Sequence, residues 1–344
     1  MTAPLRIILA GLGVRGTYWA DVITRSPRAE IAAYADPNPQ AIERAAARFG
    51  QRPAFDTPEA AVEAVTGADA LLLANPPIGR ESQIRLAAER GLPLLVEKPL
   101  ALDMAEAARL VAIAEAAQVP LMVGLNFRYL AVTQALMGLL EAGTVGEPSF
   151  ARFTYERYRD GHRPDLNKYP LTMDQPMLWE QSIHHFDLLR YVYRQEPVTI
   201  QSRTWNPPWS MYASDANVAA IITFDGGMVV NYQGTWQGNW SVPGFEWRTE
   251  CTQGIISQRD QFGALHYARR DDAALAPVTL PAHETWVTET IGLLDAFLDT
   301  VIDGVPLQCS GRDHLWSLAM VDACIRSSQS GQAVRVDSVL AGLV

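Results

Sequence analysis

The sequence predicts an α/β protein of two domains: a doubly wound parallel sheet in residues 1–125, and a second α/β domain with mostly antiparallel strands in residues 126–344. The length supports two domains, because 344 residues exceed the roughly 100 to 200 that one core usually holds. Across residues 6–124, short apolar runs alternate with longer alanine-rich stretches of helical periodicity, which predicts repeated βα units. After about Asn126, longer strand-like runs separated by turns replace this alternation.

The first domain is expected to contain five parallel strands, several of them apolar on both faces as buried parallel strands require. These strands are expected at residues 6–9, 30–34, 68–74, 93–96 and 121–123. Between strands, Thr57 ahead of Pro58 and Asp103 ahead of residues 104–117 have the sequence of helix N-caps. Strands and helices in this order predict a doubly wound sheet.

The second domain is expected to begin with a helix at residues 129–142, which Gly143 ends. Residues 217–224 and 228–236 then form a long antiparallel hairpin around a glycine-containing turn. Both faces of this hairpin carry apolar residues, so we expect helices to cover one face and a second subunit the other. Helices at residues 285–302 and 312–327 are expected to close the domain, either within it or packed back at the junction of the two domains.

Composition excludes several classes of protein. The net charge of −10 disfavours nucleic-acid binding, which depends on basic side chains that neutralise phosphates. The three cysteines form no CxxC pair, so neither a disulfide framework nor a thiolate zinc site is indicated. No segment has the pattern of a signal peptide or a membrane span. We therefore expect a cytoplasmic protein without membrane partners.

The strongest motif is the glycine-rich turn Gly11-Leu12-Gly13-Val14-Arg15-Gly16, which follows the first expected strand and opens a helix. Its glycines permit a tight turn, a close approach of the backbone to a pyrophosphate, and close packing of the helix on the strand. Asp36 lies 20 residues after Gly16, where a carboxylate accepts hydrogen bonds from both ribose hydroxyls of NAD. A carboxylate repels a 2′-phosphate, so NAD is favoured, while the nearby Arg15 leaves NADP possible. The alternative is a glycine turn without a ligand.

The second motif is Glu97-Lys98-Pro99 at the end of the strand expected at residues 93–96. Doubly wound sheets bind ligands at this edge, so we expect Lys98 to face the nicotinamide. An ammonium group there can hold a substrate oxygen or take part in proton transfer. The alternative is an ordinary surface pair of Glu97 and Lys98 ahead of a helix.

The third motif lies in the segment Trp179 to Asp187, which we expect to be helical. Glu180, His184 and Asp187 are spaced four and three residues apart, which places them on one helical face. A carboxylate beside an imidazole is suited to general acid–base chemistry. The alternatives are a salt-bridged surface helix and a metal site; no HExxH motif supports a metal, and we expect none. His185 points elsewhere and is expected to pack in the core.

Together these motifs resemble those of the Gfo/Idh/MocA family, the group of glucose-fructose oxidoreductase and inositol dehydrogenase. The resemblance rests on the glycine turn, Asn75-Pro76-Pro77, Glu97-Lys98-Pro99 and the residues from Ile183 to Asp187. It implies an N-terminal Rossmann domain, a C-terminal α/β domain whose large open sheet often mediates dimers or tetramers, and an active site to which both domains contribute. Asn75 and Pro76 are then expected at the cofactor.

The resemblance also implies roles for single residues. In such enzymes the lysine of the EKP motif and the histidine of the later helix act on the hydroxyl being oxidised, which here are Lys98 and His184. Glu180 stands where inositol dehydrogenase-like members usually have Asp, and Arg128 lies in a segment that enters the second domain near the substrate. Arg80 stands close to where a histidine is often found, and no role is assigned to it.

These expectations combine into an NAD-dependent oxidation of a sugar or polyol hydroxyl, with a small aldose such as a D-apiose-like pentose or an inositol-like polyol as substrate. The second domain holds eight of the nine Trp, and sugar C–H faces stack on such rings. Trp179, Trp209 and Tyr212 are the expected pocket residues, although most Trp in a domain fill its core or an interface. The rival functions are an NAD-dependent lyase or glycosidase with transient oxidation, and a non-catalytic NAD-sensing regulator.

Overall fold

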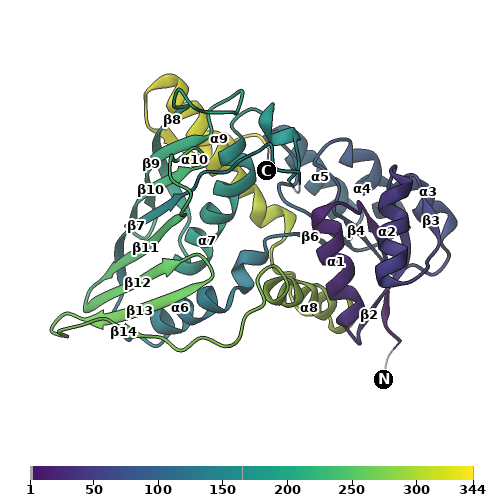
Figure 1. The fold of residues 1–344 in the computed structure, drawn as a ribbon, viewed down its shortest axis with the longest axis horizontal. Helices are drawn as coiled ribbons and strands as arrows, with labels where there is room; N and C mark the ends of the chain where they lie inside the picture. The colour runs from purple at the N-terminus through teal and green to yellow at the C-terminus, as the bar shows by residue number, and fades with distance from the viewer. Residues whose placement is uncertain (1–2, 165, 344) are drawn as a thin grey trace. The chain divides into compact units, whose positions relative to one another are not determined.

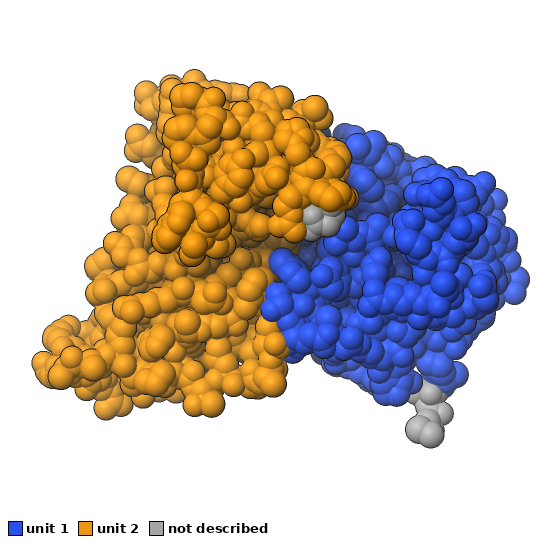
Figure 2. All heavy atoms as spheres, viewed as in Figure 1, with its two compact units in different colours: residues 1–126, 284–315 blue, residues 127–283, 316–344 orange. Residues whose placement is uncertain are grey.

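The computed structural model describes residues 3–164 and 166–343, which form two compact units (Figures 1 and 2). Unit 1 contains the chain up to Asn126 together with Glu284–Leu315. Unit 2 contains Phe127–His283 and the chain from Trp316 onward. The helix expected at residues 285–302 therefore belongs to unit 1. The pattern shows an apolar face, but it does not show which helix that face packs against.

Unit 1 is built around a six-stranded parallel sheet in the order β3-β2-β1-β4-β5-β6. Its strands are β1 (Leu5–Ala10), β2 (Ala29–Ala35), β3 (Ala54–Phe55), β4 (Ala70–Leu73), β5 (Leu94–Val96) and β6 (Leu121–Val123). All five expected strands are confirmed, and the two-residue edge strand β3 is added. Ile7, Leu72 and Leu95 are at most 1% exposed, because helices cover both faces of the sheet.

Helices connect these strands, and one further helix of the unit comes from a late segment of the chain. They are α1 (Val14–Arg25), α2 (Pro39–Phe49), α3 (Pro58–Ala64), α4 (Arg80–Glu89), α5 (Met104–Ala116) and α8 (Thr288–Asp303). Helix α1 contacts α2 and α8, whereas α4 contacts α3 and α5 (Figure 1). Both expected N-caps are confirmed: Thr57 Oγ1 accepts from the Ala60 N–H, and Asp103 Oδ1 accepts from the Glu106 N–H.

Unit 2 contains a nine-stranded sheet in the order β14-β13-β12-β11-β7-β10-β9-β8-β15. Its strands are β7 (Pro148–Glu156), β8 (Pro197–Trp205), β9 (Asn217–Phe224), β10 (Val229–Thr235), β11 (Gly244–Cys251), β12 (Gly254–Asp260), β13 (Gly263–Arg269), β14 (Ala276–Pro277) and β15 (Val334–Arg335). Only β7 and β10 pair in parallel; the other pairs are antiparallel. This large, mostly antiparallel sheet is the one that the family resemblance implied.

The remaining helices of the described residues are α6 (Ala131–Glu141), α7 (Ile183–Tyr193), α9 (Gly311–Ser330) and α10 (Val336–Leu340). Gly143, with φ of +63°, follows α6 as expected. Helix α7 lies against one face of the unit 2 sheet (Figure 1), where Phe153, Ile222 and Tyr232 are at most 2% exposed. None of the helices among the described residues has both the length and the apolar surface to cross a membrane.

The expected hairpin is present as β9 and β10, and its two faces differ. Val218 and Ile222 on one face are completely buried, whereas Ile221 on the other face is half exposed. Trp205 is the last residue of β8, and residues 206–209 continue the chain outside the strand. One apolar face of the sheet is therefore covered by this chain's helices, while the opposite face carries exposed apolar side chains.

His185 lies at the centre of the unit 2 core. Its Nδ1 is 2.8 Å from the Tyr232 hydroxyl and its Nε2 is 3.1 Å from the Gln181 amide nitrogen, a pattern that fits a neutral imidazole. The Phe153 and Tyr155 rings pack 4.7 and 5.0 Å from the imidazole. Complete burial lowers the pKa of His185 from its ordinary value of 6.5 to about 3, because a charged ring would lose its hydration.

This histidine should make the protein less stable in mild acid. Below pH 6.5 the unfolded chain binds a proton at His185 that the folded chain does not bind, so the free energy of unfolding falls with falling pH until about pH 3. Between pH 6.5 and pH 5 this one group should remove about 2 kcal/mol. In urea denaturation across this range, His185→Gln should give a dependence on pH that is shallower by that amount. Equal slopes for the two proteins would contradict the assignment.

Candidate active site

The glycine-rich turn has the steric form that its three glycines predict. Gly11 follows β1 with φ of +86°, and a Cβ there would lie 2.5 Å from the Asn75 backbone nitrogen at the end of β4. A Cβ on Gly16 would lie 1.8 Å from the Gly11 carbonyl oxygen. Both positions therefore exclude a side chain, so the start of α1 packs directly against the ends of β1 and β4.

Gly13 differs from the other two glycines, because a Cβ there would meet no atom within 4 Å. It is the N-cap of α1, makes no side-chain cap hydrogen bond, and is followed by a first turn without acidic residues. The amino end of α1 thus keeps backbone N–H groups and the positive end of the helix dipole available for an anion. These features fit the pyrophosphate of a dinucleotide.

Asp36 directly follows β2 and contacts the glycine turn. Its Oδ2 accepts a 2.6 Å hydrogen bond from the Leu12 N–H, and its Oδ1 accepts one of 2.8 Å from the Asn38 N–H. The carboxylate therefore lies at the carboxyl edge of the sheet beside the turn, in the position that suits an acceptor of ribose hydroxyl groups.

Glu97 ties the EKP segment to helix α1. Its Oε1 accepts from Arg15 Nε and from Trp19 Nε1, each at 2.8 Å, and Arg15 Nη2 lies 2.7 Å away. Glu97 is 6% exposed and Trp19 is completely buried. Arg15 is thus engaged with Glu97, which weakens the case that it serves a 2′-phosphate. Lys98 is the next residue after this anchored carboxylate.

Asn75 and Arg80 make the next contacts at the loops after β4 and β5 in unit 1. Asn75 Nδ2 donates to Gln83 at 3.1 Å, while its buried Oδ1 has no protein partner among the described residues. Arg80, 1% exposed, donates to carbonyl oxygens of both loops, including those of Asn75 and Glu97. Sequence reasoning gave Arg80 no role; the one available signal was a charged residue where the family often has histidine.

In unit 2, the segment that carries Glu180 is not an ordinary α-helix. Residues Leu178–Ser182 form a π-helical turn (η3) that runs into α7. Glu180 Oε1 accepts a 2.6 Å hydrogen bond from the Tyr169 hydroxyl, which comes from the short 3-10 helix η2 (Tyr169–Leu171). Sequence reasoning missed Tyr169, because it lies eleven residues before Glu180, outside the spacing of one helical face. π turns occur frequently at functional sites.

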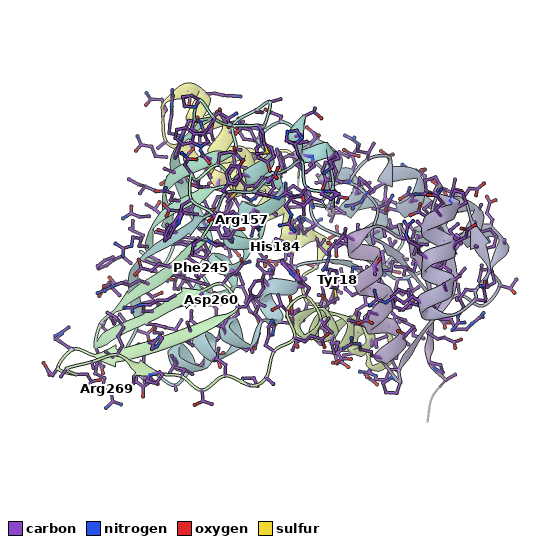
Figure 3. The ribbon with its side chains drawn as sticks, viewed as in Figure 1. Tyr18, Arg157, His184, Phe245, Asp260 and Arg269 are labelled. Carbon is purple, nitrogen blue, oxygen red and sulfur yellow. The ribbon has the colours of Figure 1, made fainter. Side chains whose placement is uncertain are left out.

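His184, the second residue of α7, is labelled in Figure 3, and its imidazole is held by ring stacking. Its imidazole stacks on the Phe127 ring, with 4.2 Å between ring centroids and an angle of 19° between the planes. Only 6% of His184 is exposed. The stacking restricts the rotation of the imidazole, so its two nitrogens keep fixed directions.

Asp187 does not join Glu180 and His184 in the way that their spacing predicted. Its two oxygens accept from Arg128 Nη2 at 2.5 Å and Nε at 2.7 Å, and Oδ1 also accepts from Ser317 at 3.3 Å. Arg128 and Asp187 are both more than nine-tenths buried. The pair fixes the segment after β6 to α7, so the expected contact of Arg128 with substrate stays a prediction.

The three aromatic residues expected in the pocket lie in different surroundings. Trp209 is half exposed, and its Nε1 donates to the Gln237 carbonyl oxygen at 3.0 Å, which holds the indole at the surface of unit 2. Trp179 is 6% exposed. Tyr212 is 4% exposed, and its hydroxyl hydrogen-bonds both the side chain and the carbonyl oxygen of Arg159. Trp209 thus presents the most accessible ring of the three.

The residues expected at the active site fall into two sets. The glycine turn, Asp36, Asn75, Pro76, Glu97 and Lys98 belong to unit 1, and Arg128, Trp179, Glu180, His184, Trp209 and Tyr212 belong to unit 2. Within the described residues, no group of three or more His, Cys, Asp or Glu side chains is placed to hold a metal ion.

Comparison with known protein families identifies the chain. The model of an oxidoreductase family with an NAD-binding Rossmann fold, GFO_IDH_MocA, matches residues 5–125. The model of the GFO/IDH/MocA C-terminal domain matches residues 133–257, so the two matches together cover more than half of the chain. The chain belongs to the GFO/IDH/MocA family. This confirms the resemblance inferred from the motifs, the class of oxidoreductase and the dinucleotide NAD as cofactor.

Individual relatives extend over nearly the full length. D-apiose dehydrogenase of Rhizobium rhizogenes is 25% identical over 334 residues, covering 94% of this chain and 93% of the relative. Inositol 2-dehydrogenase of Rhizobium meliloti is 24% identical over 334 residues, covering 94% and 96%. An oxidoreductase of Agrobacterium radiobacter, solved with NAD+, L-tartaric acid and magnesium, has a TM-score of 0.89 at 22% identity, covering 98% of this chain and 100% of that chain. The last comparison confirms the fold.

The glycine turn gives a paired prediction. Gly16→Ala should destabilise the protein by about 1–3 kcal/mol or more, because its Cβ would overlap the Gly11 carbonyl oxygen. Gly13→Ala should keep the melting temperature and raise the Kd for NAD+ at least about tenfold, because the methyl group fills space needed by the pyrophosphate. Thermal unfolding and calorimetric titration with NAD+ measure both effects. Wild-type affinity in Gly13→Ala would contradict the assigned binding site.

Proposed function

We propose that the protein is an NAD-dependent dehydrogenase that oxidises a secondary or anomeric hydroxyl group of a sugar or polyol. The observation that carries this proposal is the position of Lys98, two residues after β5 at the carboxyl edge of a sheet in which the turn after β1 fits a dinucleotide. Two relatives matching over nine-tenths of the chain are named D-apiose dehydrogenase and inositol 2-dehydrogenase. Both names describe oxidation of a hydroxylated carbon compound.

In this proposal each unit contributes residues to one reaction. Bound NAD+ supplies the hydride acceptor at nicotinamide C4. Lys98 holds the substrate oxygen by donating a hydrogen bond, and His184 takes the hydroxyl proton as the C–H hydride leaves, so that a carbonyl product forms. Glu180, fixed by Tyr169, orients the imidazole and stabilises its charged form. Lys98 and His184 can also exchange these roles, with Lys98 as the base.

For the substrate, we propose a small aldose such as a D-apiose-like pentose, or an inositol-like polyol. The exposed ring of Trp209 supports this, because the C–H face of a sugar packs on an indole whose N–H is already hydrogen-bonded elsewhere. Trp179 and Arg128 are the further candidates for contact with the substrate. Tyr212 is proposed to act through Arg159, since its own hydroxyl is engaged there.

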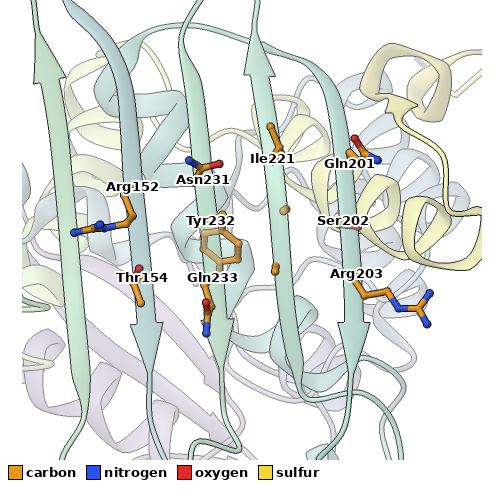
Figure 4. A pocket seen from close by; sticks show the side chains of 11 residues that line it. Arg152, Thr154, Gln201, Ser202, Arg203, Ile221, Asn231, Tyr232 and Gln233 are labelled. Carbon is orange, nitrogen blue, oxygen red and sulfur yellow. The ribbon is translucent and has the colours of Figure 1, made fainter.

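The exposed face of the unit 2 sheet supports a further part of this proposal, the self-association of the protein. Phe150 on β7 pairs in register with Val229 on β10, and these residues are 55% and 36% exposed. Ile221 on β9, 50% exposed, lies in the neighbouring row beside a hollow that β7, β8, β9 and β10 line (Figure 4). We propose that a second copy of the chain covers this face, forming a dimer or tetramer.

The charges around this face suit an interface between two copies of the chain. Arg152 on β7 pairs with Glu246 on β11 at 2.5 Å, while Arg203 lines the hollow on its β8 side. A twofold rotation can therefore bring opposite charges of two copies together.

The net charge of −10 and the free thiols of the three cysteines support our expectation of a reducing cytoplasm and of no nucleic-acid partner.

A screen of aldoses and polyols with NAD+ and NADP+ in parallel tests the proposed function. At least one compound should yield NADH, with NAD+ preferred over NADP+ because of Asp36. In single-turnover experiments, Lys98→Ala and His184→Ala should each lower the rate of hydride transfer by about 100- to 10,000-fold, while the Kd for NAD+ changes little. His266→Ala, on β13, serves as the matched control.

Three outcomes would count against this proposal. Near-normal hydride transfer in both variants would exclude the mechanism. Substrate consumption without free NADH would indicate a lyase or glycosidase with transient oxidation. Failure of every compound in the screen to reduce bound NAD+ would favour an NAD-sensing regulator.

The self-association is tested separately. By light scattering, the wild-type protein should be a dimer or tetramer, and Ile221→Asp should dissociate it, because the new carboxylate would be buried in the proposed interface without a partner. Val305→Asp places the same charge at a 44% exposed position of unit 1 and should leave the assembly intact. A monomeric wild-type protein, or equal behaviour of the two variants, would contradict the proposed interface.

A further inference from the structure

Arg80 holds two loops of unit 1 together through backbone carbonyl groups. It is the first residue of α4 and 1% exposed. Its Nη1 donates to the carbonyl oxygens of Glu97 at 2.7 Å, Pro99 at 2.6 Å and Leu100 at 3.1 Å. Its Nη2 donates to the carbonyl oxygen of Asn75 at 2.7 Å. One side chain thus joins the loop after β4 to the loop after β5.

The chemistry of the guanidinium group suits this arrangement. A buried charge is costly unless hydrogen bonds replace its hydration, and charge-assisted hydrogen bonds are stronger than neutral ones. The planar fork presents its donors in fixed directions, so Arg80 reaches both loops at once. A lysine has one nitrogen, and a glutamine amide has no charge; neither can replace all four hydrogen bonds in this geometry.

The carbonyl groups that accept hydrogen bonds from Arg80 lie on both sides of Lys98 in the chain. The Glu97 and Pro99 carbonyl groups belong to the residues immediately before and after it. The Glu97 side chain is fixed in addition by Arg15 and Trp19 of α1. The backbone that carries Lys98 is therefore anchored from two helices, α1 through a carboxylate and α4 through Arg80.

We propose that Arg80 is a positioning residue that sets the direction of the Lys98 side chain, by holding the carbonyl groups on either side of it. This inference rests on the proposed function, in which Lys98 acts on the substrate oxygen. Because the backbone is fixed on both sides of Lys98, its ammonium group can occupy fewer positions. This favours the position from which it acts on the substrate oxygen. A purely structural role, in which Arg80 only joins α4 to the sheet, is the competing explanation.

The composition of the chain makes the direction of Lys98 measurable without a substrate. The chain has only two lysines, Lys98 and Lys168, beside 26 arginines. Reductive methylation with ¹³C-formaldehyde labels the two lysine side chains and the amino terminus. In a Lys168→Arg background, one lysine signal remains in the NMR spectrum, and it belongs to Lys98. All variants are compared in this background as full-length proteins.

Arg80→Gln should change the chemical shift of the dimethyl-Lys98 signal and narrow its line, because the side chain samples more positions. Arg80→Lys should move the signal by less, since one ammonium group can still hold part of the carbonyl set. Arg52→Gln is the matched control: Arg52 also donates to backbone carbonyl oxygens in unit 1, those of Ile31 at 2.7 Å and Gln51 at 2.8 Å. This control should leave the Lys98 signal unchanged.

A lower melting temperature of Arg80→Gln with an unchanged Lys98 signal would overturn the inference, because Arg80 would then be only structural. If Arg80→Gln does not fold, Arg80→Lys decides the question by the same signal. Added NAD+ should shift the Lys98 signal of the wild-type protein; no shift would contradict the proposed function and leave the comparison of Arg80 variants valid. With a substrate from the screen, Arg80→Gln should lower kcat at least about tenfold and change KM less than about threefold.

Discussion

The carboxylate of Glu97 is the contact on which the dinucleotide-binding unit depends most. It accepts hydrogen bonds from Arg15 within the glycine turn and from Trp19 just after it, and it immediately precedes Lys98. The Arg15 side chain is 24% exposed and Glu97 is 6% exposed, so loss of Arg15 would leave a nearly buried carboxylate without its charged partner, which is unfavourable. The turn that fits the cofactor and the loop that carries Lys98 are thereby fixed relative to each other. The glycine turn and Lys98, the proposed catalytic residue of this unit, therefore share one scaffold.

Much of the fold was predictable, because its causes are local in the sequence. Buried parallel strands such as β4 have to be apolar on both faces, and caps such as Thr57 have to supply an acceptor. The two residues of β3 are too few to show any periodicity. The position of α8 in unit 1 was also not predictable, since an amphipathic pattern gives the buried face of a helix and not the element that it packs against.

The site was predictable where side chains carry the signal. Gly11, Gly16 and Asp36 have the conformation or contacts that their motif requires. Arg80 was missed because the acceptors by which it joins the two loops are backbone carbonyl groups, which every residue possesses. Tyr169 was missed because it lies eleven residues before Glu180, outside the spacing of one helical face. Asp187 was misplaced, since its spacing gives no indication of Arg128, which lies 59 residues away.

The π-helical turn at Leu178–Ser182 affects how this helix is compared between relatives. A π turn holds more residues than an α turn and is commonly a single bulge within an α-helix. The angle around the helix axis between Glu180 and a residue of α7 therefore differs from the angle that the α-helical repeat would give. An alignment of a relative with a regular α-helix here needs a one-residue gap if both flanks are to coincide. In such an alignment, the acid before the histidine should be matched by its three-dimensional position.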